Sequence, residues 1–103
     1  MKKADFQNIE ELVDYSEGGI LSKQLLKTAT QDVTLFCMAE GTELSEHTST
    51  KDGFVYVLEG NGIFNMEGKD IIMKEGAFIP IRKNVIHSLR ANENTSFILS
   101  LWK

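Results

Sequence analysis

The sequence predicts an all-β protein, a sandwich or barrel built from about eight short antiparallel strands. Three observations point to this class. Apolar residues recur with a period of two over most of the chain after residue 19. Clusters of glycine with polar residues separate these runs at short intervals, as turns do. No helical pattern is long enough to connect parallel strands, which argues against βαβ units.

The first element expected is a short helical turn over residues 8–13. Asn8 suits its N-cap position, and Glu11 suits the reciprocal position of a capping box. A pair of glycines ends the segment, and the period of the apolar residues then changes to two. Residues 1–19 are therefore expected to form an N-terminal segment that precedes the strands.

The strands follow, and the strongest is 54–59, which is rich in β-branched and aromatic residues. Gly60-Asn61-Gly62 is expected to be a tight turn that returns the chain into the next strand. The eight expected strands cover residues 20–27, 33–38, 54–59, 63–66, 71–73, 77–81, 86–89 and 97–102. A chain of 103 residues can bury one core, so we expect a single domain over 1–103 with the barrel at about 20–102.

Composition and charge limit the expected partners. The net charge is −4, and the sequence has no basic run that would suit nucleic acid or an anionic membrane surface. The start of the chain lacks the apolar run of a secretory signal, and no apolar stretch approaches the ~20 residues that span a bilayer. Cys37 is the single cysteine, which fits a reducing compartment. We expect a cytoplasmic protein with neither nucleic acid nor membrane as a partner.

The only two histidines, His47 and His87, are the candidate functional residues. Each lies in or beside a β segment, and strands this distant in sequence can be neighbours in a barrel. Imidazole can ligate a metal ion, move a proton or bind a ligand at neutral pH. The sequence therefore predicts one pocket that contains both histidines, although each ring could instead be purely structural.

The segment around His47 resembles the first signature motif of the cupin superfamily. Gly41, His47 and Gly60 stand at the spacing of that motif. Ser49 takes the place of the second histidine of the motif, and Gly53 takes the place of its glutamate.

The segment around His87 resembles the second cupin motif. Gly76 and His87 stand at its spacing. Arg82 replaces the proline of the motif, Asn84 replaces its inner glycine and Ala91 replaces its final asparagine. Asn for Gly is conservative where the backbone needs a positive φ.

The resemblance covers about residues 20–102 and implies a double-stranded β-helix, or jelly-roll barrel, that is often dimeric. It does not imply one function, because cupins include dioxygenases, isomerases, decarboxylases, storage proteins and sugar-binding regulators. Typical members hold a divalent metal with three histidines and one glutamate, of which only His47 and His87 remain here. Two imidazoles are a poor cage, so Zn, Ni, Mn or Fe would bind weakly unless Cys37 or Glu59 added a ligand.

The two lost ligands also change the expected shape of the pocket. Small residues at positions 49 and 53 leave space beside the imidazoles for water or a ligand, unless neighbours fill it. Two valines share the strand parity of position 53 and would wall this space. Arg82, if it lies at the rim, could attract an anionic group such as a carboxylate. The residues expected in the pocket are His47, Ser49, Gly53, Val55, Val57, Arg82 and His87.

Three functions are compatible with the sequence, and it singles out no catalytic residue. The first is a barrel with a degenerate metal site that binds an unidentified small molecule. The second is a metal-dependent enzyme, an isomerase or oxygenase, that uses His47 and His87 on a small polar metabolite. The third is a structural or interaction protein whose homodimer is the function. Edge strands and apolar outer faces need covering, which favours a homodimer in each case.

Overall fold

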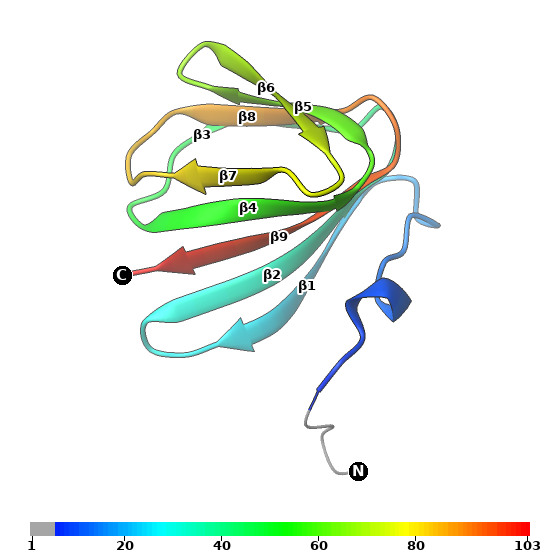
Figure 1. Ribbon diagram of the computed structural model, residues 1–103, viewed down its shortest axis with the longest axis horizontal. Helices are drawn as coiled ribbons and strands as arrows, with labels where there is room; N and C mark the ends of the chain where they lie inside the picture. Colours follow the sequence, from blue (N-terminus) through cyan, green and yellow to red (C-terminus); the bar gives the residue numbers. More distant parts are fainter. Residues whose placement is uncertain (1–5) are drawn as a thin grey trace.

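The computed structural model describes residues 6–103, and this part of the chain forms two packed β-sheets (Figure 1). The start of the chain, where a secretory signal was not expected, lies largely outside the described residues. The elements are the 3₁₀ turn η1 (Ile9–Glu11) and the strands β1 (Ile20–Lys27), β2 (Gln31–Met38), β3 (Glu43–His47), β4 (Asp52–Glu59), β5 (Asn61–Met66), β6 (Lys69–Lys74), β7 (Phe78–Ile81), β8 (His87–Ala91) and β9 (Thr95–Trp102). No helix among the described residues is long and apolar enough to cross a membrane.

One sheet contains five strands in the order β1-β2-β9-β4-β7, and the other contains four in the order β3-β8-β5-β6. All the strand pairs are antiparallel. The chain repeatedly passes from one sheet to the other, so strands distant in sequence become neighbours, as in a jelly roll. The predicted all-β jelly-roll class is confirmed.

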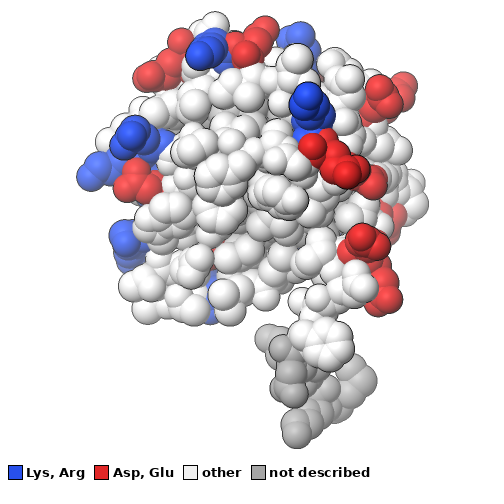
Figure 2. Space-filling view, viewed as in Figure 1, with Lys and Arg blue, Asp and Glu red and all other residues white. Residues whose placement is uncertain are grey.

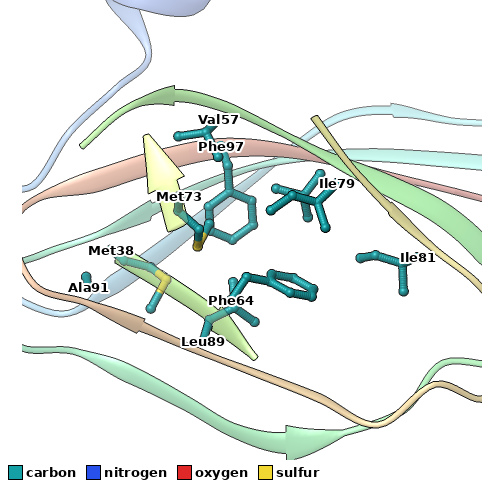
Figure 3. Close-up of a cluster of buried hydrophobic side chains, with 10 residues drawn as sticks. Met38, Val57, Phe64, Met73, Ile79, Ile81, Leu89, Ala91 and Phe97 are labelled. Atoms are coloured by element: carbon teal, nitrogen blue, oxygen red, sulfur yellow. The ribbon is translucent and has the colours of Figure 1, made fainter. Parts of the chain in front are cut away.

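The core lies between the two sheets. Phe64 of β5 and Phe97 of β9 project toward each other from opposite sheets (Figure 3). Met38 and Met73 pack beside them, and all four side chains are at most 2% exposed. Ile81 lies on the opposite side of this cluster from Met38, toward the other end of the barrel.

Strand β3 was not among the eight expected strands. It begins with Glu43 and pairs with β8, but only Leu44 among its residues is partly buried. The pairing shifts register between Leu44 and His47, so the strand has no clean alternation of apolar and polar residues. A short, bulged and polar strand lacks the period of two by which the others could be predicted.

The expected return turn at Gly60 was wrong in its topology. Strand β4 belongs to the five-stranded sheet and β5 to the four-stranded sheet, so Gly60 is a corner between sheets. Its φ is 123°, and a Cβ there would lie 2.5 Å from the Thr95 Cα atom. By contrast, Gly68 lies in a true hairpin between β5 and β6, with a φ of 85°. Asn84 has a φ of 68°, as expected where it replaces a glycine.

The helical turn near the start of the chain is confirmed as the shorter η1. The Asn8 side chain caps it by accepting a hydrogen bond from the Glu10 N–H at 3.0 Å. Two contacts then fasten the N-terminal segment to the five-stranded sheet. The Tyr15 hydroxyl donates to Glu59 at 2.8 Å, and the Lys23 ammonium donates to the Leu12 carbonyl at 2.8 Å.

Candidate functional site

The two histidines meet because β3 and β8 are neighbours in the four-stranded sheet. His47 ends β3, His87 begins β8, and the two residues are direct partners in the pairing. Their ring centroids are 4.1 Å apart with an interplanar angle of 63°. The His87 ring also stacks on Phe64, with centroids 5.5 Å apart and an angle of 6°. The predicted proximity of the two histidines is confirmed.

Each ring is oriented by a hydrogen bond to the backbone of its own segment. The Nδ1 of His47 lies 2.8 Å from the Ser45 carbonyl, and the Nδ1 of His87 lies 3.0 Å from the Val85 carbonyl. A carbonyl oxygen only accepts, so Nδ1 carries the hydrogen in both rings. Neutral imidazole then leaves an unprotonated lone pair at Nε2. Within residues 6–103, neither Nε2 has a hydrogen-bond partner.

The two rings differ in exposure. His87 is 6% exposed, and burial lowers its pKa below the ordinary value because a charged ring would lose its hydration. The bond to the Val85 carbonyl opposes this shift, whereas the nearby His47 reinforces it. His47 itself is exposed at the mouth of the barrel. The inner ring of the pair is therefore held neutral at pH 7.

The histidine pair separates two adjoining cavities that share His47, Ile81, His87 and Leu99. The inner cavity has a volume of about 50 Å³, and its other lining residues are all apolar: Phe36, Leu44, Val55, Phe64, Leu89 and Phe97. The outer cavity has a volume of about 470 Å³ and is completed by Thr48, Ser49, Thr50 and Leu101. The two imidazoles are the only titratable groups among the residues that line either cavity.

The residues present do not fit a resident metal ion of the kind that the cupin motifs imply. The pair supplies two neutral nitrogen donors, and a protein metal site usually needs three or four protein ligands. Among the described residues, no group of three or more His, Cys, Asp or Glu side chains could hold a metal ion. Cys37 lies buried on β2, and Glu59 accepts the Tyr15 hydrogen bond at the far end of β4. Neither residue lines the cavities.

Position 53 shows why the lost glutamate has no substitute. Gly53 pairs with Leu101, and a Cβ at Gly53 would lie 2.2 Å from the Ser100 carbonyl oxygen and 2.6 Å from the Leu101 side chain. Leu101 thus fills the space beside Gly53 that the sequence left open. Ser49 lines the outer cavity, but its hydroxyl accepts a hydrogen bond from the Lys51 N–H at 3.0 Å and supports the local turn.

The other expected pocket residues fall in three different places. Val55 lines the inner cavity, whereas Val57 is fully buried in the core. Arg82 is exposed and lines an outer groove with Phe54, Phe78 and Trp102. The structure therefore brings His47, Ser49, Val55 and His87 together, and it leaves Arg82 on the outside of the barrel.

Sequence reasoning missed most of the apolar walls. Leu99 and Leu101 lie two residues apart on β9 and both line the outer cavity, so the period of two in the last expected strand carried this signal. Phe36 could be assigned only to the core, because the sequence does not show where a cavity remains between core side chains. Leu44 lies on β3, the strand that was not predicted.

Two sheets closed around an interior with paired histidines at its open end define a cupin-type barrel. The model of the family described as the Cupin domain matches residues 34–102, and the chain belongs to this family. Among curated proteins, no sequence matches the chain significantly.

Solved structures agree with this assignment. A conserved protein of unknown function from Streptococcus pyogenes superposes with a TM-score of 0.88 at 23% identity, over 100% of this chain and 90% of that chain. A cupin 2 conserved barrel domain protein from Leptotrichia buccalis gives 0.87 at 33% identity, over 94% of this chain and 47% of that chain. A cupin superfamily protein from Desulfitobacterium hafniense gives 0.88 at 17% identity, over 99% and 94%. These neighbours are similar in fold, and their names identify no ligand.

Proposed function

We propose that this protein binds a small organic molecule at the open end of its barrel, without a resident metal ion. The observation that carries the proposal is the pair of neighbouring imidazoles with unpartnered Nε2 atoms in a cavity otherwise walled mainly by apolar side chains. Ligand sites of this type combine apolar walls with a few polar groups that fix orientation. An outer cavity of about 470 Å³ is within the usual range for small ligands.

The rival function, a metal-dependent isomerase or oxygenase, requires ligands that the site does not provide. Two nitrogens leave most of the coordination sphere to water, so the ion would exchange readily. A carboxylate cannot enter at position 53 without displacing Leu101 and the Ser100 carbonyl. We therefore favour direct contact between the imidazoles and an organic ligand, in a protein that we expect in the cytoplasm.

The test combines metal analysis with a ligand screen on the same purified protein. After dialysis against a chelator, we expect well under one equivalent of any transition metal and an unchanged melting temperature. A fragment library screened by NMR should shift the Hε1 signals of His47 and His87 together. Stoichiometric metal that survives the chelator would overturn the metal-free function. A screen in which no compound shifts either histidine would overturn small-molecule binding at this site.

A further inference from the structure

The hydrogen-bonding chemistry of the histidine pair narrows the class of ligand, and this inference rests on the proposed function. Both Nδ1–H groups donate to backbone carbonyls, at 2.8 Å for His47 and 3.0 Å for His87. Each ring can therefore offer the cavity only the lone pair of its Nε2. We propose that the ligand is a neutral aliphatic 1,2-diol, with one hydroxyl donating to each imidazole.

A site that offers two acceptors selects a molecule with two donors. Neutral hydroxyls donate, whereas a carboxylate at neutral pH only accepts and would oppose two lone pairs. His87 is 6% exposed, and a buried acceptor left without a donor costs free energy, so a ligand that offers this ring no hydroxyl binds less well. The hydroxyls of a 1,2-diol lie on adjacent carbons and can reach two rings whose centroids are 4.1 Å apart.

The walls of the site favour a ligand without charge. No Lys, Arg, Asp or Glu side chain lines either cavity in the described part of the chain. A charged group would leave water and find no partner of opposite sign there. Arg82, which could have attracted a carboxylate, instead lines the outer groove beside Trp102. The nearest acidic residue in sequence, Glu46, lines a groove on the other face of the four-stranded sheet.

The sizes of the two cavities indicate which of them holds the carbon chain of the ligand. The inner cavity, about 50 Å³, holds little more than one or two groups of the size of a water molecule, which takes about 30 Å³. The carbon chain of the diol must therefore lie in the outer cavity of about 470 Å³, against Ile81, Leu99 and Leu101. These three side chains supply a continuous apolar wall next to the imidazoles, where a chain of several carbons loses contact with water.

Three probes of equal chain length test the ligand class: 1,2-hexanediol, 1-hexanol and hexanoate. Each is titrated at pH 7.5 while the Hε1 and ring nitrogen signals of the histidines are followed by NMR. We expect the diol to bind most tightly and hexanoate at least about tenfold more weakly than the diol, since a site that accepts hydrogen bonds from hydroxyls strongly rejects an analogue without these donors. The same spectra of the free protein should show Nδ1 protonated and Nε2 unprotonated in both rings.

Two variants and a matched control complete the test. His87→Phe keeps an aromatic ring against Phe64 and should abolish the preference for the diol over the alcohol, as should His47→Phe. Ser88→Ala changes the neighbouring residue, which lines the outside of the sheet, and should leave all three affinities unchanged. Because the unmodified protein alone gives the order of affinities, a variant that fails to fold does not remove the test.

The outcomes separate this inference from the proposed function. Hexanoate binding as tightly as the diol, or both rings protonated at Nε2, overturns the diol while small-molecule binding stands. The diol is also overturned if no probe shifts the histidines but a library compound does. If neither the probes nor any library compound shifts the histidine signals, both the diol and the proposed function are overturned.

Discussion

The two ends of the barrel interior are built from opposite kinds of residue. At one end, Met38 and Met73 pack against Phe64 and Phe97, and all four side chains are at most 2% exposed, although the two phenylalanines also line the small inner cavity beside the histidines. At the other end, the His47–His87 pair and Leu101 surround space that remains open. Methionine and phenylalanine together fill irregular space well, because the thioether chain adapts to the rigid ring. We therefore expect the packed end to supply most of the stability, while the other end keeps two unpartnered nitrogens and open volume.

The sharpest way to break this comparison is to remove one side chain from each end. Phe97→Ala at the packed end should lower the free energy of unfolding by about 3–5 kcal/mol, since it leaves a large cavity among buried neighbours. Leu101→Ala at the open end should cost less than half as much, because Leu101 is only partly buried and borders the large outer cavity, whereas Phe97 borders only the small inner one. Chemical denaturation of both variants measures the difference. Equal losses would show that the open end is also part of the stabilising core.

The next prediction concerns Gly53, where β4 and β9 lie too close together for a side chain. Gly53→Ala places a Cβ 2.2 Å from the Ser100 carbonyl oxygen, so the β4–β9 pair must shift, at a cost of about 2–3 kcal/mol. Gly19→Ala is the matched control, because no atom lies within 4 Å of its added Cβ and its φ is not positive. The control should change the free energy of unfolding by less than about 1 kcal/mol. A Gly53→Ala variant as stable as the control would refute the account of why no carboxylate fits here.

Leu101 and Gly60 show how far the sequence could predict the structure. The period of two predicted the strands and the residue type predicted the left-handed Asn84, because both depend on local residue chemistry, whereas the barrel and the neighbouring histidines followed from the spacing of the two motifs. The role of Leu101 could not be predicted, since it depends on how a side chain of β9 packs over a glycine of β4. The corner at Gly60 was missed for a similar reason. Glycine permits a positive φ in a hairpin and at a corner alike, and only the close approach of Thr95 distinguishes them.

A third prediction uses the charge preference of the inner histidine. The pKa of His87 is lowered in the folded protein, and in the unfolded chain it returns to about 6.5. As the pH falls through about 6.5, the unfolded state gains a proton that the folded state resists, so stability falls. Above that pH both states are neutral and the effect vanishes. Melting temperatures from pH 8 to pH 5 should fall more steeply for the unmodified protein than for His87→Phe, and parallel curves would contradict the lowered pKa.

The outside of the five-stranded sheet carries exposed aromatic side chains. Substitutions on this face should affect stability less than substitutions at either end of the interior. Tyr56, Phe78 and Trp102 are 42%, 58% and 38% exposed there, and Phe54 packs between Phe78 and Trp102 with ring centroids 4.9 and 6.0 Å apart. The centre of the face over β7, β4 and β9 has no charged side chain (Figure 2). An exposed apolar face of this kind favours a protein interface.

The charges around that face indicate which partner it suits. Lys and Arg lie on the side where β9 stops and along the top of the view, whereas the side opposite the end of β9 carries mostly Asp and Glu (Figure 2). A two-fold axis in the plane of the face would set the basic side of one copy against the acidic side of the other. We therefore expect a homodimer that pairs through this face, with a mass near twice 11.6 kDa by light scattering at micromolar concentration.

Phe78→Lys should halve the mass, because it places a charge within this apolar face, and it should change the monomer's free energy of unfolding by less than about 1 kcal/mol, since Phe78 is 58% exposed and loses mainly its contact with Phe54. Ile72→Lys introduces the same charge at a side chain that is 60% exposed on the four-stranded sheet, and it should leave the dimer intact. High salt should weaken the dimer, since it screens the charges at the rim. A monomeric parent protein at high concentration, or a dimer lost equally in both variants, would exclude this face as the interface.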